Sequence, residues 1–225
     1  MSSGLASPYK GVFFDLDGTL ADTAPDLVAA ANQLLIARNL PPKPYEVLRP
    51  CASAGARGLI GGAFGINPEH PDFVPLRDEF FSNYEKALLV NSVIFEGVDH
   101  LLNQLDEAKL PWGIVTNKSE RFTHPLTELM GLRQRAVSTV CGDTTPHSKP
   151  HPEPILHAAR IANIDPSKSV YVGDDIRDII AGKAAGMMTI AAAYGYCGCE
   201  EPPEAWGADY LVRHPKELLQ IIFPQ

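Results

Sequence analysis

The chain has 225 residues, of which 45% are hydrophobic and 20% charged, and its formal net charge is −8. This length and composition are those of a globular protein that buries a full core without disulfide or metal cross-links. The negative charge argues against nucleic acid or an anionic membrane surface as the main partner. An anionic small molecule would have to be attracted locally, by a metal ion or by a few well-placed cations.

No segment of the sequence indicates export or membrane insertion. The first ten residues lack the apolar run of a signal peptide, and no later apolar run is long enough to span a bilayer. The spacing of the four cysteines, Cys51, Cys141, Cys197 and Cys199, does not resemble a disulfide framework. We therefore expect a cytoplasmic protein with reduced thiols. A metal or redox role for Cys197 and Cys199 is the less favoured alternative.

The first predicted element is a buried strand at residues 12–14, which ends in Asp15 and is followed by a turn at Gly18. The chain then shows one helical pattern after another, joined by proline-rich connectors. Helices are expected at 24–38, 44–49, 55–63 and 72–89. We interpret residues 23–92 as an all-helical insertion after the first strand, called the insert below.

Beyond the insert, short apolar runs alternate with helical patterns. Strands are expected at 112–116, 136–140, 169–172, 188–192 and 209–212, and helices at 97–108, 120–130, 152–162 and 175–185. This alternation predicts an α/β fold with a doubly wound, parallel, Rossmann-like sheet. The core is expected to consist of residues 1–22 and 93–225.

Acidic residues directly follow two of the predicted strands. Asp15 and Asp17 follow the first strand, and Asp174 and Asp175, with Asp178 nearby, follow a later one. Residues i and i+2 of a strand point the same way, and open α/β sheets bind ligands outside the carboxyl ends of their strands. We therefore expect these carboxylates to meet at one rim. The alternative is a solvated acidic loop, or helix caps at Asp174 and Asp175.

A carboxylate cluster of this kind needs a counter-charge. Carboxylates about 4 Å apart repel each other by about 4 kcal/mol per pair at a surface-like dielectric. Such a cluster takes up protons or holds a cation, and hard oxygen ligands with open positions favour Mg²⁺. The sequence therefore predicts a magnesium site at this rim.

Two further segments carry groups suited to holding a phosphate. Thr116 and Asn117 end a predicted strand with a hydroxyl and an amide, although Thr116 could instead cap the next helix. Lys149, which precedes a proline, supplies a positive point charge. A lone lysine is usually a solvated surface residue, so the case for Lys149 depends on its neighbours.

Taken together, these segments resemble the four ordered motifs of the haloacid dehalogenase superfamily. The motifs are DLDGT at 15–19, VTN at 115–117, SKP at 148–150 and GDDIRD at 173–178. The resemblance spans residues 10 to about 213, and the insert matches the mobile cap of the family. It implies a magnesium-dependent phosphatase that works through an aspartyl-phosphate intermediate.

The resemblance implies a role for each matching residue. Asp15 would be the nucleophile that takes the phosphoryl group. Asp17 would protonate the leaving oxygen and then deprotonate the attacking water. Thr116 and Lys149 would hold the phosphoryl group, and Lys149 would also restrain Asp15. Three more residues would contact the substrate: Gly18, Thr19 and Asn117.

The implied metal site draws on both acidic motifs. Mg²⁺ would bind the side chains of Asp15 and Asp174 and the backbone carbonyl of Asp17, and Asp175 would support its water shell. The acid at Asp17 disfavours the transport ATPases and dehalogenases of the superfamily, which lack it. A sugar phosphomutase remains an alternative enzyme, and a non-catalytic binding module, which would not need Asp17, is the alternative of another class.

The layout as a whole resembles phosphoglycolate phosphatases. More specific stretches, SAGAR at 53–57, WG at 112–113, YGY at 194–196 and WGAD at 206–209, are similar to the bacterial N-acetylmuramic acid 6-phosphate phosphatases of cell-wall recycling. Ala54 stands where glycine is expected. We favour the sugar phosphate over phosphoglycolate as the small-molecule substrate, with a monomer or homodimer as the assembly.

Both candidate substrates carry a carboxylate. Arg57 is the residue of the insert best suited to a bidentate contact with it. An exposed helical arginine without a ligand is an equally good interpretation of Arg57.

Overall fold

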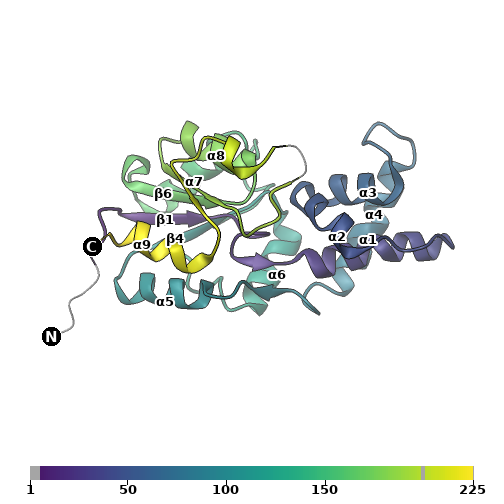
Figure 1. Cartoon of the computed structure of the whole chain (residues 1–225), viewed down its shortest axis with the longest axis horizontal. Coiled ribbons are helices and arrows are strands. Elements are labelled where there is room, and N and C mark those ends of the chain that lie inside the picture. The colour runs from purple at the N-terminus through teal and green to yellow at the C-terminus, as the bar shows by residue number, and fades with distance from the viewer. Residues whose placement is uncertain (1–5, 199–200, 225) are drawn as a thin grey trace.

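The computed structural model describes residues 6–198 and 201–224, so Cys199 lies outside the described residues. A parallel six-stranded sheet forms the centre of the molecule (Figure 1). Its strands, in spatial order, are β5 (Thr139–Val140), β4 (Trp112–Val115), β1 (Gly11–Phe14), β6 (Ser169–Gly173), β7 (Met188–Ala192) and β8 (Tyr210–Val212). The predicted α/β class with a doubly wound parallel sheet is confirmed. Within the described residues, no helix is both long and apolar enough to cross a membrane.

Both faces of this sheet are covered, which explains why its central strands are apolar throughout. Val12 and Phe14 of β1 pack in one hydrophobic cluster, whereas Phe13, between them, packs in another. The first face is covered by α5 (Val98–Glu107), α6 (Glu120–Leu129) and α9 (Leu218–Ile222), and the second by α7 (Glu153–Ala162) and α8 (Ile176–Ala184). Successive side chains of a strand point to opposite faces, so the residues of the short strand β1 contribute to two hydrophobic clusters.

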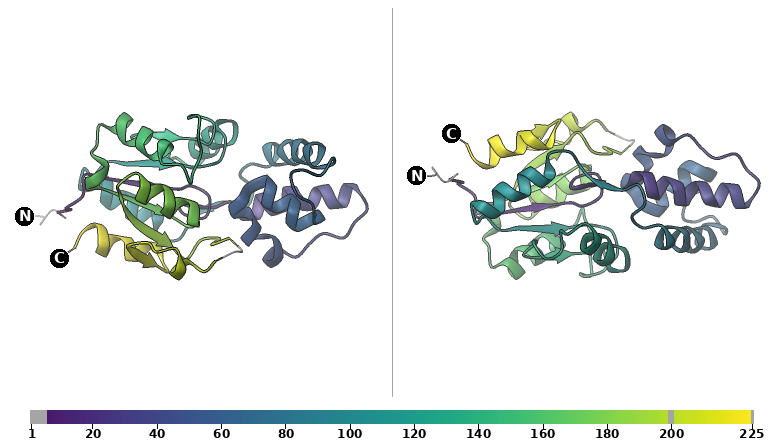
Figure 2. Two further views of the ribbon diagram at one scale, coloured as in Figure 1. Left: turned by 90° about the horizontal axis from the view of Figure 1, so that it is seen from above. Right: turned by 90° about the horizontal axis from the view of Figure 1, so that it is seen from below.

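The insert forms a separate helical layer with its own hydrophobic cluster. Its helices are α1 (Ala24–Ala37), α2 (Tyr45–Leu48), α3 (Gly55–Phe64) and α4 (Phe73–Lys86), with a 3₁₀ turn at Pro50–Ala54. Leu34, Leu59, Ile60 and Phe80 are among the residues buried between them. Figures 1 and 2 show this layer beyond the carboxyl ends of the sheet strands. The insert therefore lies over the rim where the acidic motifs end.

Two short strands join the insert to the core. β2 (Ala21–Asp22) and β3 (Val93–Ile94) pair antiparallel where the chain enters and leaves the helical layer. The sequence analysis did not predict this ribbon, because two residues are too few to show a period. The helices of the insert, by contrast, begin and end within about three residues of their expected bounds.

Asp26 fixes the returning connection to the first helix of the insert. Its carboxylate accepts hydrogen bonds from the backbone N–H groups of Val90, Asn91 and Ser92 at 2.9–3.1 Å and from the Ser92 hydroxyl at 2.6 Å. The side chain is buried, with 2% of the residue exposed. Burial acts to raise the pKa of Asp26, but the hydrogen bonds from Ser92, Val90 and Asn91 outweigh it and hold the pKa below its usual value.

We predict that Asp26→Ala lowers the free energy of unfolding by about 3 kcal/mol at neutral pH, because several donors lose their acceptor at once. Chemical denaturation measures this loss. Asp72→Ala is the matched control, since Asp72 is exposed and makes no capping hydrogen bond at the start of α4. Equal stability of the two variants would contradict the anchoring role of Asp26.

The same variant has a defined pH dependence. A carboxylate with a lowered folded-state pKa stabilises the protein above its unfolded pKa, and this contribution is lost as the pH falls through the folded pKa. The difference in stability between wild type and Asp26→Ala should therefore be constant above about pH 5 and shrink below about pH 4.

Candidate active site

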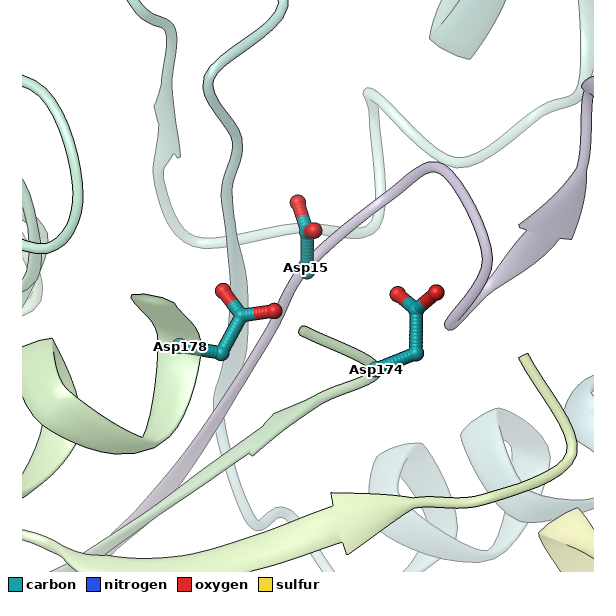
Figure 3. A group of neighbouring side chains, drawn as sticks. All are labelled: Asp15, Asp174 and Asp178. Carbon is teal, nitrogen blue, oxygen red and sulfur yellow. The ribbon is translucent and has the colours of Figure 1, made fainter. Parts of the chain in front are cut away.

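Three strand ends and one loop bring the predicted site residues together. Asp15 follows β1, Thr116 follows β4 and Asp174 follows β6, while Lys149 comes from the loop before α7. Figure 3 shows the carboxylates of Asp174 and Asp178 on either side of Asp15. The neighbouring strands β4, β1 and β6 are parallel, so their carboxyl ends open on the same rim.

Lys149 is the cation at the centre of this cluster. Its Nζ lies 3.0 Å from Asp15 Oδ1 and 2.6 Å from Asp178 Oδ1, and it also donates to the carbonyl of Val115 and the hydroxyl of Tyr171. The residue is buried, with 3% exposed. Burial acts to lower the pKa of Lys149, but the charges of Asp15 and Asp178 outweigh it and raise the pKa above its usual value. The ammonium is therefore a fixed positive charge beside Asp15.

Asn117 holds the loop that carries Lys149. The Asn117 amide donates to the Lys149 carbonyl and accepts from the Lys149 backbone N–H, both at 2.9 Å. Its side chain is thus committed to the backbone of Lys149, although the residue also lines the cavity described below. The structure gives Asn117 a positioning role that the sequence did not predict. Thr116 is buried and also lines the cavity; its hydroxyl accepts from the N–H of Lys118.

The metal-binding potential of the cluster lies in Asp15, Asp174 and Asp178. Each offers a carboxylate oxygen, and these oxygens lie within 4.8 Å of one another. Burial, followed by the charges of Asp15 and Asp178, raises the pKa of Asp174 well above its usual value. Hard oxygen donors that repel one another in a buried site fit a divalent cation such as Mg²⁺.

Asp15 and Asp174, the two side chains expected to bind the metal, both belong to this set, and Asp178 joins them. Asp175, expected to support the water shell of the metal, caps α8 and is bonded to Arg177 and to Ser53 of the insert. These contacts, Arg177 foremost against the opposing effect of burial, lower the pKa of Asp175 to about 2. Asp178, in the first turn of α8, faces the cluster. The capping geometry of the helix decides which of the two carboxylates turns inward.

Thr19 and Gly18 shape the pocket around Asp174. The Thr19 hydroxyl donates to Asp174 at 2.9 Å, and the N–H of Tyr196 donates to the other carboxylate oxygen at 2.8 Å. Gly18 has a φ of +85°, and a Cβ there would lie 2.0 Å from Asp174 Oδ2. A side chain at position 18 is excluded both by the backbone conformation and by the carboxylate.

Asp17 is held by two residues that the sequence analysis did not single out. Its carboxylate accepts hydrogen bonds from the hydroxyl of Thr23 and, at 2.9 Å, from the ammonium of Lys118. The Lys118 side chain is only 8% exposed. The only signal in the sequence was the position of Lys118 directly after the VTN motif, which by itself resembles a surface lysine.

A cavity of about 330 Å³ opens on these carboxylates. Its floor is formed by core residues that include Asp15, Asp17, Thr116 and Lys149. Its walls come mostly from the insert and are apolar: Leu27, Ala52, Ala54, Ala56, Phe80, Phe81 and Tyr84, joined by Phe122 of α6.

Arg57 does not line this cavity. It is exposed and borders a second cavity, beside Arg177 and Cys197. Successive residues of a helix are rotated by about 100°, so Arg57 points away from the face of α3 that carries Ala56. The predicted contact of Arg57 with a substrate held at Asp15 is therefore not supported by this geometry.

Comparison with known proteins places these features in context. Residues 12–192 match the family described as haloacid dehalogenase-like hydrolase. The chain is 43% identical to an N-acetylmuramic acid 6-phosphate phosphatase from Pseudomonas putida over 95% of this chain and 96% of the relative. It is 42% identical to a phosphoglycolate phosphatase from Xanthomonas campestris over 93% of this chain and 94% of the relative.

A solved structure from Haemophilus somnus, described as a predicted phosphoglycolate phosphatase, has the same fold. Its TM-score is 0.84 at 26% identity, over 96% of this chain and 98% of the other. The fold, the ordered motifs and the relatives all agree on one class of hydrolase. The identities of 43% and 42% do not separate the two named substrates.

We predict that Mg²⁺ raises the melting temperature of this protein through the cluster of Asp15, Asp174 and Asp178. At a concentration one hundred times its Kd, a ligand adds about 2.7 kcal/mol, which corresponds to roughly 5 to 10 °C for a chain of this size. Thermal unfolding with and without Mg²⁺ measures the shift.

The variant Asp174→Asn should lose this response. Without metal it should be at least as stable as wild type, because the substitution removes like-charge repulsion in a buried site. The control Asp78→Asn changes an exposed carboxylate and should keep the full shift. An unchanged Mg²⁺ response in Asp174→Asn would contradict the metal site.

Proposed function

Because this chain belongs to the haloacid dehalogenase-like hydrolase family, we propose that it hydrolyses a phosphate monoester through a phosphoryl group carried on Asp15. The enzyme is a phosphoric monoester hydrolase, as are the relatives that match it over nearly their whole length. The observation that carries the mechanism is the ion pair of Asp15 with the buried Lys149, at 3.0 Å.

In the proposed reaction, a carboxylate oxygen of Asp15 attacks phosphorus and the ester oxygen leaves. Asp17 gives that oxygen a proton, then removes a proton from the water that cleaves the acyl phosphate and regenerates Asp15. Lys149 and Thr116 hold the phosphoryl oxygens, where positioned positive charge lowers the barrier most. Lys118 and Thr23 keep Asp17 in one orientation for both proton transfers.

The cofactor that fits this cluster is Mg²⁺. Asp15, Asp174 and the backbone carbonyl of Asp17 would hold it, and Asp178, whose carboxylate lies in the same cluster, would join them. When bound, it would supply positive charge to the phosphoryl oxygens. Without it, this acidic protein would have to obtain that positive charge from lysine alone.

The substrate we propose is N-acetylmuramic acid 6-phosphate, and phosphoglycolate is the second candidate. A cavity of about 330 Å³ is much larger than a two-carbon leaving group and is in the range that buries a whole small ligand. Its aromatic wall suits the apolar face of a sugar ring. The insert, residues 23–92, would act as the cap that selects the leaving group. With this substrate the enzyme would act in cytoplasmic recycling of cell-wall sugars.

We predict that Asp15→Asn abolishes turnover, since the amide nearly keeps the shape of the carboxylate but cannot attack phosphorus. Phosphate release should fall at least about 10⁴-fold, toward the catalysis that remains when a nucleophile is removed. Asp165→Asn is the matched control because Asp165 is exposed and remote, in the turn before β6. Substantial turnover by a pure Asp15→Asn preparation would refute the covalent mechanism.

A panel of substrates tests the choice of leaving group. We expect kcat/KM for N-acetylmuramic acid 6-phosphate to exceed that for 2-phosphoglycolate by at least about tenfold, because the sugar can use the wall contacts of the insert. Free phosphate is the readout, which also separates hydrolysis from a mutase reaction. The reverse order of the two substrates would favour the second candidate.

A further inference from the structure

The wall of the cavity contains a polar group that the protein itself does not satisfy. Tyr84, on α4 of the insert, is 1% exposed, and its O–H has no hydrogen-bond acceptor within residues 6–198 and 201–224; the neighbouring Lys118 ammonium can only donate to it. The side chain lines the cavity above Asp15 and Asp17. Burying a hydroxyl without a partner costs free energy, so such groups are rare unless a ligand or water completes them.

The other buried tyrosines differ in this respect. The hydroxyl of Tyr171 donates to the carbonyl of Val115, and the hydroxyl of Tyr196 bonds to Thr23. Ser138 is the other buried side chain of the described residues without a partner, but it lies against Gly113 and does not line the cavity. Among the described residues, Tyr84 alone combines a buried hydroxyl that lacks an acceptor with a place in the cavity wall.

Lys118 lies directly beside Tyr84. Its ammonium is 4.7 Å from the centre of the Tyr84 ring and donates a hydrogen bond to Asp17 at 2.9 Å. An ammonium has three N–H donors, so donors remain for a further acceptor. Burial raises the pKa of Tyr84, which keeps its hydroxyl protonated and able to donate.

We infer that the Tyr84 hydroxyl and the Lys118 ammonium together bind an oxygen atom of the leaving group, close to the ester oxygen. This assignment rests on the proposed function, because Asp17 marks where the ester oxygen leaves. These two neighbouring groups both have hydrogen-bond donors left over, and a sugar hydroxyl, a ring oxygen or a carboxylate would supply the acceptor. The pair therefore selects oxygen-rich leaving groups over hydrocarbon ones, and Tyr84 is a specificity-determining residue of the insert.

The test is Tyr84→Phe, which removes one oxygen atom and keeps the ring against Lys118. Its kcat/KM should fall about tenfold for N-acetylmuramic acid 6-phosphate or for 2-phosphoglycolate, the size expected for one hydrogen bond to a substrate. For phenyl phosphate, whose leaving group has no second oxygen, the change should stay within about twofold. A loss confined to one oxygenated substrate identifies whether a sugar oxygen or a carboxylate is the acceptor.

A second measurement separates recognition from a structural role. Because the Tyr84 O–H has no acceptor among the described residues of the free protein, Tyr84→Phe should melt at the same temperature as wild type or higher. A lower melting temperature with equal losses on all three substrates would overturn the inference, and so would unchanged kcat/KM on both oxygenated substrates.

The matched control is Tyr45→Phe, another tyrosine of the insert that does not line the cavity. It should keep wild-type values on all three substrates. A loss of selectivity in Tyr45→Phe equal to that in Tyr84→Phe would also overturn the inference. Failure of the wild type to release phosphate from any of the substrates would overturn the proposed function itself.

Discussion

The site depends on one buried cation held among carboxylates. The carboxylates of Asp15, Asp174 and Asp178 repel one another in a largely buried site, and Lys149 offsets this repulsion by direct contact with two of them. The rest of the site supports this arrangement. Asn117 fixes the loop of Lys149, Thr19 and Tyr196 occupy the oxygens of Asp174, and the parallel sheet sets the strand ends side by side.

In the proposed function the insert would contribute selectivity, because its surface differs in kind from that of the core. The core offers charges and hydrogen-bond donors at fixed positions, whereas the insert covers them with aromatic and small apolar side chains. Contacts across the boundary include hydrogen bonds, from Ser53 to Asp175 and from Arg49 to the carbonyl of Gly195, and the packing of Phe122 against Phe81 and Tyr84. The core and the insert thus share one cavity.

The sequence predicted those parts of the site whose positions depend on neighbouring residues in the chain. Asp15 and Asp174 could be predicted to meet because each ends an apolar run, and the sheet then decides their positions. The side to which Arg57 points could not be predicted, since one residue of helical rotation separates Ala56, in the cavity wall, from Arg57, which borders the second cavity.

Two other features of the site also could not be predicted from local sequence. Asp175 and Asp178 were both reasonable metal neighbours, and only the cap of α8 turns one outward and the other inward. Lys118 owes its importance to Asp17 and Tyr84, which are distant in sequence and give no local signal.

The β2–β3 ribbon affects how the chain tolerates changes in the length of the insert. The ribbon holds the two ends of the insert together, so for the core the insert is a closed loop. The entropic cost of closing such a loop grows by only roughly 0.6 kcal/mol for each doubling of its length. The core can therefore accept inserts of different size without altering its own strand register.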